Sequence, residues 1–271
     1  MEGTVSFVEN RSKEVKKMTN RRWLTGACMA AAMIMWPSTQ AEAQKDDFGV
    51  WLDVGIEKKL SSKWSMSAEL DFRTRNNSKT LSRWSSFGLN AEYKIVKHLK
   101  ASAGYMLLYD NNPEELDLKS DKLTPNKWTP SYWHMRHRTH VTLTGSASIG
   151  RLGLSLRERW QYTYRPAAEG KRYDIDEATW GDIKGKGKNI WRNRLQMDYD
   201  IAHWRLDPFA SAETFVDKSG IQKIRYTVGV DYKIKKQHVF SVSYKYQNVN
   251  DNEDDTESNS HILGLSYKYK F

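Results

Sequence analysis

Cysteine is almost missing from this sequence. The single cysteine among the 271 residues is Cys28, which lies in a segment that we expect to be removed on export. The mature chain would then have no disulfide. It would also have no thiolate nucleophile and no thiolate metal ligand.

Long apolar runs are missing after residue 43. No later stretch approaches the ~18 consecutive apolar residues of a membrane-spanning helix, and helical periodicity does not appear there. Long basic runs are missing too, although the formal net charge is +10. Because this charge is dispersed, the sequence argues against a nucleic-acid partner.

Aromatic residues, in contrast, are abundant. The chain has 11 Trp, 14 Tyr and 8 Phe, while its mean hydropathy is −0.76. So many large rings can bury enough surface to order a chain whose average residue is polar. A chain that is disordered throughout is therefore excluded.

Residues 18–43 have the pattern of a secretory signal peptide. Arg21 and Arg22 form its basic region, residues 23–36 form its apolar region, and Ala43 ends a small-x-small cleavage site. We expect cleavage after Ala43 and export from the cytoplasm.

The domain organisation follows from this leader. Residues 1–17 are polar and precede the basic region, so we interpret them as an upstream extension with Met18 as the true start. Residues 44–271 form the mature domain.

The mature domain alternates strictly between apolar and polar residues, as residues 63–73 illustrate. Period-two alternation is typical of half-exposed β-strands. Most segments approach the ~9–11 residues of a tilted membrane-spanning strand and exceed the ~5–6 residues of a soluble one. The eleven expected strands are residues 47–58, 63–74, 83–95, 99–109, 133–145, 151–164, 189–201, 206–216, 224–234, 238–247 and 261–271.

Short and long connections alternate between these strands, as in outer-membrane barrels with short periplasmic turns and long external loops. The sequence therefore predicts an all-β fold, an antiparallel up-and-down transmembrane β-barrel of about 10–12 strands. Bacterial single-chain barrels have even strand numbers, so we expect ten or twelve strands rather than eleven. The long connections are residues 75–82, 110–132, 165–188, 217–223 and 248–260, which we expect to be solvated loops.

Trp and Tyr suit the two interfaces of a membrane because each has an apolar body and a polar tip. The last strand also carries Tyr267 and Tyr269 and stops at Phe271. This ending resembles the C-terminal signature that the barrel-insertion machinery reads in outer-membrane proteins. The expected interfacial residues are Trp51, Trp64, Trp84, Trp133, Trp160, Trp191, Tyr267 and Tyr269.

The whole mature chain resembles the domain-of-unknown-function 2490 family of Gram-negative outer-membrane β-barrels. The resemblance lies in FGVWLDVGIEKKLSSKWSMSAELDFR, LSLRERWQYTYR, IWRNRLQMDYDI and the closing VGVDYKI, VFSVSYKYQ and LGLSYKYKF. It implies a barrel in the outer membrane, surrounded by lipid, and it implies no activity.

Charged residues fill the polar side of several strands, which faces the lumen in a membrane barrel. Arginines at i and i+2 point to the same side, and they can either cross-link a closed lumen through carboxylate pairs or line an anion pathway. The expected lumen network is Glu69, Asp71, Arg73, Arg136, Arg138, Arg157, Arg159, Arg192, Arg194 and Asp198.

Catalytic and metal-binding patterns are weak. His134 and His140 share a strand face but lie roughly 20 Å apart at ~3.3 Å per residue, too far to bind one metal. No G-x-S-x-G elbow is present. We therefore expect no enzyme activity and no cofactor.

The sequence predicts an outer-membrane barrel that acts as a small channel or as a structural membrane component. One alternative is a soluble secreted barrel that binds an apolar ligand, because alternation does not say which face points inward. A second alternative is an outer-membrane enzyme that modifies lipids.

Overall fold

The computed structural model describes residues 46–235, 237–250 and 258–271. The expected extension, the expected signal peptide with Cys28, and most of the acidic stretch 250–257 lie outside the described residues. In the described part, no helix is both long and apolar enough to cross a membrane.

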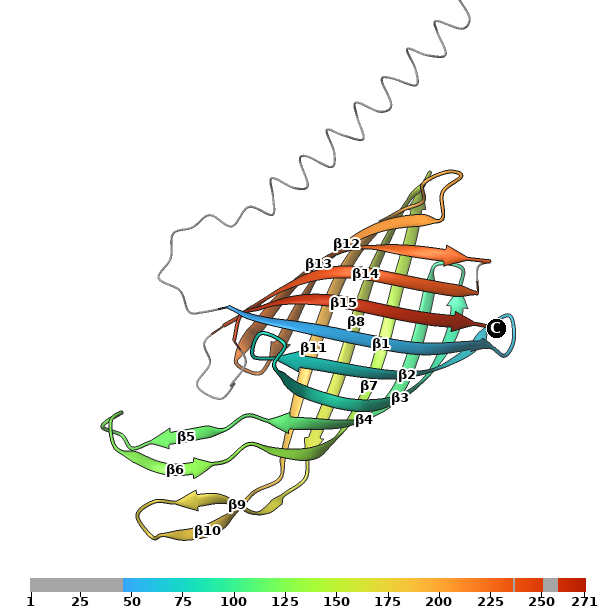
Figure 1. Ribbon diagram of the computed structural model, residues 1–271. Helices are drawn as coiled ribbons and strands as arrows, with labels where there is room; N and C mark the ends of the chain where they lie inside the picture. The colour runs from blue at the N-terminus through green and yellow to red at the C-terminus, as the bar shows by residue number, and fades with distance from the viewer. Residues whose placement is uncertain (1–45, 236, 251–257) are drawn as a thin grey trace, which may run out of the picture. The chain divides into compact units, whose positions relative to one another are not determined.

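Eleven strands close into one barrel, and each corresponds to an expected strand (Figure 1). The predicted all-β barrel is therefore confirmed. The barrel strands are β1 (Asp47–Lys59), β2 (Trp64–Arg75), β3 (Thr80–Val96), β4 (Leu99–Asn112), β7 (Tyr132–Ile149), β8 (Leu152–Arg165), β11 (Lys186–Tyr199), β12 (Leu206–Asp217), β13 (Gly220–Ile234), β14 (His238–Val249) and β15 (Ser260–Lys270).

The barrel closes through a parallel pair, because β1 lies along β15 from Asp47 opposite Ser260 to Glu57 opposite Lys270. All other neighbouring barrel strands are antiparallel. The expectation of an even strand number was wrong. Strand direction alternates along the chain, so an odd number makes the first and last strands run the same way.

The two ends of the barrel differ. At one end, which we call the turn end, short connections join the strands and the chain stops at Phe271. At the opposite end, which we call the loop end, residues 113–131 and 166–185 connect the barrel strands. Two expected loops there are tight turns: residues 76–79 join β2 to β3, and residues 218–219 join β12 to β13.

The two longest connections form a second sheet instead of irregular loops. It consists of β5 (Glu115–Leu118), β6 (Pro125–Thr129), β9 (Ala168–Asp174) and β10 (Thr179–Ile183). Trp128 lies opposite Tyr173 in the ladder that joins the two hairpins, and the Tyr173 and Trp180 rings lie 5.2 Å apart. These cross-strand aromatic contacts order segments whose turn-forming residues suggested loops. The sheet extends beyond the barrel at the loop end (Figure 1).

Apolar residues face outward from the barrel. Leu52, Leu70 and Val242 are exposed on three different strands, whereas most buried residues are polar. A soluble barrel has an apolar interior and a polar exterior. The described strands do not have such an apolar interior, which the soluble alternative requires. The outward apolar band and the polar interior are those of a transmembrane barrel. The buried polar residues include Asp71, Arg83, Ser86, Asp110, His140, Thr142, Gln161, Glu213, Ser243 and Gln247.

Candidate functional site

The turn-end half of the lumen is lined mainly by small polar side chains. These side chains point inward by strand alternation, yet they remain partly or fully accessible to water. Their accessibility shows that this half of the lumen is less tightly filled than the opposite half. We call this half the vestibule and define it by Ser67, Glu69, Asn90, Ser102, Ser155, Asp198, Ser211, Ser241 and Ser266.

The loop-end half of the lumen is filled. Inward side chains of β2, β3, β4, β7 and β12 are buried there. Most of them are charged or carry amide, imidazole or hydroxyl groups. We call this half the constriction and define it by Asp71, Arg83, Asp110, His140 and Glu213.

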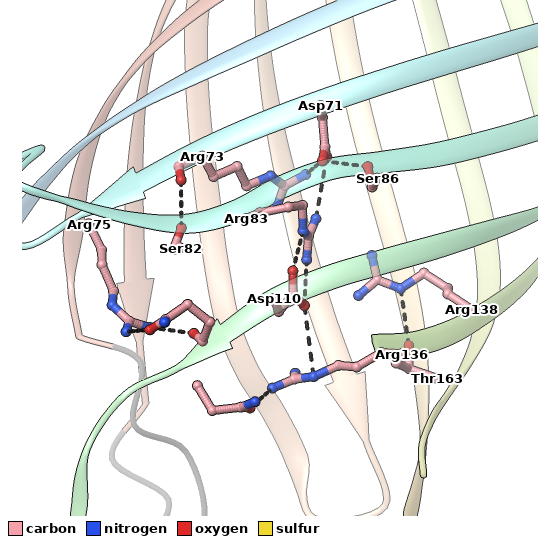
Figure 2. A network of polar contacts seen from close by, with 12 residues as sticks. Asp71, Arg73, Arg75, Ser82, Arg83, Ser86, Asp110, Arg136, Arg138 and Thr163 are labelled. Carbon is pink, nitrogen blue, oxygen red and sulfur yellow. Dashed lines mark hydrogen bonds and ion pairs between the residues drawn. The ribbon is translucent and has the colours of Figure 1, made fainter. Parts of the chain in front are cut away.

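Arg83 holds one wall of the constriction together (Figure 2). Its Nε donates to Asp110 Oδ1 at 2.6 Å and its Nη2 to Asp110 Oδ2 at 3.1 Å. Its Nη1 donates to Asp71 Oδ2 at 3.3 Å. Asp71 also accepts hydrogen bonds from Arg73 at 2.6 Å and from the Ser86 hydroxyl. One buried guanidinium therefore joins β2, β3 and β4, and Arg136 of β7 lies 3.8 Å from Asp110.

Strict alternation places Arg83 on the outer face, together with Phe87, and therefore does not select it as a lumen residue. The ladder between β3 and β4 is irregular between Arg83 and Phe87. This irregularity turns Arg83 inward, while Trp84 is 56% exposed. A β-bulge redirects side chains in this way. Asp110, in contrast, follows the outward Tyr109, so alternation could have found it.

Glu213 of β12 is the acceptor on the opposite wall. It accepts hydrogen bonds from Arg157, and from Arg192 Nη2 at 2.9 Å and Nε at 3.1 Å. Arg225 Nη1 lies 3.7 Å away. Three guanidiniums therefore share one carboxylate, which satisfies its lone pairs but leaves a net positive wall.

Trp51 lies in the lumen and not in the expected interfacial belt. Its ring centre is 4.0 Å from Arg73 and 4.8 Å from Arg225, and Lys245 lies 5.3 Å away. The outward positions of β1 are those of Phe48 and Leu52, so the odd-numbered Trp51 points inward. Its ring contacts a cation from each of the two walls.

Three expected lumen arginines, Arg138, Arg159 and Arg194, make no ion pair with a carboxylate in the residues that the structure describes. Arg138 Nε donates to Thr163 Oγ1 at 3.0 Å, and Arg159 Nε donates to Thr142 Oγ1 at 2.9 Å. Two expected carboxylates, Glu69 and Asp198, lie in the vestibule and likewise make no ion pair among the described residues. Within the expected lumen network, Asp71 pairs with Arg73, and Arg157 and Arg192 both pair with Glu213. Arg136 lies near Asp110.

The inward histidines lie apart, as their spacing suggested. His140 Nε2 lies 3.3 Å from Asn90 Oδ1, and His134 Nε2 lies 3.1 Å from the Pro166 carbonyl. Gly104 makes room for the His140 ring, since a Cβ there would lie 2.5 Å from His140 Cε1. Within the described ranges, no group of three or more metal-ligating side chains is arranged to bind a metal.

The expected assembly signal ends the barrel at the turn end. The Phe271 amide donates to the Glu57 carbonyl at 2.9 Å, and the Tyr269 and Phe271 rings stack 5.5 Å apart. Lys58 Nζ lies 5.4 Å from the Phe271 ring centre. The last residue is therefore fixed to β1.

Several solved structures are similar to this chain. The β domain of the Bordetella autotransporter Brka is 14% identical over 71% of this chain and 80% of that chain, with a TM-score of 0.49. The NanC porin is 12% identical over 82% of this chain and 95% of its own, with a TM-score of 0.44. The Escherichia coli outer membrane transporter YddB is 9% identical over 73% of this chain and 34% of its own, with a TM-score of 0.29.

No curated protein sequence matches this chain. One family model does match it, over residues 48–258, and its description is "Protein of unknown function (DUF2490)". The matched region runs from β1 to the connection before β15 and so includes most of the barrel. The chain belongs to the DUF2490 family.

Proposed function

We propose that this protein spans the outer membrane as a small porin-like channel. The observation that carries the proposal is the combination of an apolar exterior with a polar vestibule whose inward side chains remain accessible. Outer-membrane barrels place short turns on the periplasmic side and long loops outside. The vestibule would then open to the periplasm, and the hairpin sheet would lie at the cell surface.

The constriction would set the size of the solute that passes. Its side chains are held by ion pairs and hydrogen bonds from strands on opposite walls, so its geometry is defined. A small hydrophilic solute would cross without chemical change. Lipid would surround the barrel, and the barrel-insertion machinery would recognise the end at Phe271.

The filled constriction also supports a second function. Trp51 lies between Arg73 and Arg225, which belong to different walls. A lumen crossed in this way conducts little if the contacts persist. The protein would then be a structural component of the membrane, stiffened by its internal ion pairs.

Two measurements test these proposals in order. Cells that express the full-length chain are fractionated, and the membrane fraction is run on SDS gels with and without boiling. A heat-modifiable band in the outer membrane supports the barrel assignment, and a periplasmic, heat-insensitive protein overturns it. The purified protein is then placed in planar bilayers, where stepwise conductance supports the channel and silence supports the structural component.

A further inference from the structure

Four arginines form a compact block on the lumen wall where the vestibule meets the constriction. Arg157 and Arg159 lie on β8, and Arg192 and Arg194 lie on β11. Arg159 is directly opposite Arg192, and Arg157 is directly opposite Arg194. Residues in such positions have Cβ atoms about 4.5–5.5 Å apart, and like charges there destabilise a sheet. We call these four residues the arginine block.

The protein compensates this charge incompletely. In the described part of the chain, Glu213 is the carboxylate that contacts the block, through Arg157 and Arg192, and it is shared with Arg225. Arg159 and Arg194 have no such contact. The Nε atoms of Arg157 and Arg194 are buried without a hydrogen-bond acceptor, which is costly for a charged group.

The side chains that accept hydrogen bonds from Arg159 Nε and from Arg192 Nη1 are neutral. Arg159 Nε donates to Thr142 Oγ1 at 2.9 Å, and Arg192 Nη1 donates to Gln161 Oε1 at 3.2 Å. Hydroxyl and amide oxygens orient a guanidinium but do not neutralise it. The block therefore keeps a net positive charge with fixed donor directions.

Two side chains of the arginine block are not fully enclosed. The side chain of Arg157 is 13% exposed and that of Arg192 is 14% exposed. On the turn-end side of the block, the inward side chains of Ser155 on β8 and Asp198 on β11 are accessible as well. A small anion in the vestibule can therefore approach the block directly.

We infer that the arginine block binds the oxyanion group of a small solute, such as a phosphate, sulfate or carboxylate. Guanidiniums present paired N–H donors that match two oxygens of such a group, whereas a halide offers a single point of contact. The bound oxyanion supplies the negative charge that Arg159 and Arg194 do not receive from a carboxylate, and it offers acceptors to the unpaired Nε atoms of Arg157 and Arg194. This inference rests on the proposed function in one respect, since the solute must enter through the lumen.

Anion binding can be measured without conduction. The purified, folded barrel in detergent is heated with increasing inorganic phosphate, and the ionic strength is held constant with chloride. A ligand that binds only the folded state raises the melting temperature in a saturable way. We expect such a rise for phosphate but not for chloride.

Two substitutions locate the site. Arg159→Gln and Arg194→Gln each remove a guanidinium that has no carboxylate contact, so neither leaves a carboxylate unpaired. Each should weaken phosphate binding by about tenfold or more, as expected for the loss of a charge-assisted hydrogen bond. Without phosphate, each variant should be at least as heat-stable as the wild type, because like-charge repulsion is relieved. Arg151→Gln, in the β7–β8 turn outside the lumen, is the matched control and should bind phosphate normally.

Each outcome has a definite meaning. Equal stabilisation by phosphate and chloride overturns the inference, as does full phosphate binding by both block variants. Phosphate binding without conductance would support the oxyanion site and overturn the proposed channel function. Conductance without stabilisation by phosphate would support the channel function and overturn the oxyanion site.

Discussion

The guanidinium carbon of Arg73 on β2 lies 4.0 Å from the centre of the Trp51 ring on β1. Arg225 lies 4.8 Å from the same ring. It belongs to β13, which is separated from β1 by β15 and β14. Cation–π contacts of this kind contribute about 0.5–2 kcal/mol each. The indole is therefore held inside the lumen by cations on both sides.

If the proposed channel is correct, removal of the Trp51 ring should widen its lumen. We expect Trp51→Ala to increase the single-channel conductance, because the Trp51 ring lies between Arg73 and Arg225. Trp191→Ala is the matched control, since Trp191 is exposed on the outer face. Equal conductance in the two variants would show that Trp51 does not limit flow.

Arg83→Ala should be strongly destabilising. It leaves Asp71 and Asp110 buried without their shared guanidinium, and a broken buried ion pair costs about 3–5 kcal/mol. The measurement is the temperature at which the folded band on an unboiled gel converts to the unfolded one. Arg73→Ala should lower that temperature less, since Arg73 is 24% exposed and Arg83 9% exposed. The reverse order would contradict the central role of Arg83.

Leu70→Arg should impair assembly in the membrane. Leu70 is exposed on the outer face of β2, and an arginine near the bilayer midplane costs roughly 2–4 kcal/mol. Ser67→Arg, on the same strand but facing the vestibule, is the control and should assemble normally. Assays of heat-modifiable mobility report both. Normal folding of Leu70→Arg in native membranes would count against a lipid-facing β2.

Asp121, in the β5–β6 turn, should make that turn sensitive to strong acid. It accepts the Thr124 hydroxyl at 2.5 Å and the amides of Thr124 and Leu123, each at 2.9 Å. These hydrogen bonds lower the pKa of Asp121 from 3.8 to about 2. The stabilisation is complete above pH 3.8 and is lost as the pH falls through about 2.

Carboxyl NMR chemical shifts of Asp121 measure this directly. Amide hydrogen exchange of Leu123 and Thr124 should accelerate over the same pH range. In Asp121→Asn, the acid-dependent change at these amides should disappear. A titration midpoint near 3.8 would mean that the turn does not hold the carboxylate in solution.

Much of the barrel could be predicted because one rule, period-two alternation, governs most strands. It located all eleven barrel strands and the inward direction of residues such as Arg157 and Arg192. It failed at Arg83, because a bulge shifts the alternation by one residue. The expectation for Trp51 was also wrong, because Trp51 was assigned to the membrane interface from its residue type, whereas Phe48 and Leu52 occupy the outward positions of β1.

Long-range pairing was the other source of error. Residues 113–131 and 166–185 contain turn-forming residues, yet they order each other through the ladder between β6 and β9. Glu213 was missed for a similar reason, since its partners lie on β8, β11 and β13. Such contacts join residues far apart in the chain, and local patterns do not report them.

The parallel β1–β15 seam has a consequence for how the barrel is made. Every other ladder of the barrel joins two barrel strands that are consecutive along the chain, whereas the seam joins the first barrel strand to the last. Parallel pairing is also slightly weaker per residue than antiparallel pairing. In the proposed orientation, with Phe271 on the periplasmic side, β1 begins at the cell surface. The N-terminal end of the domain would then have to cross the bilayer before the barrel could close.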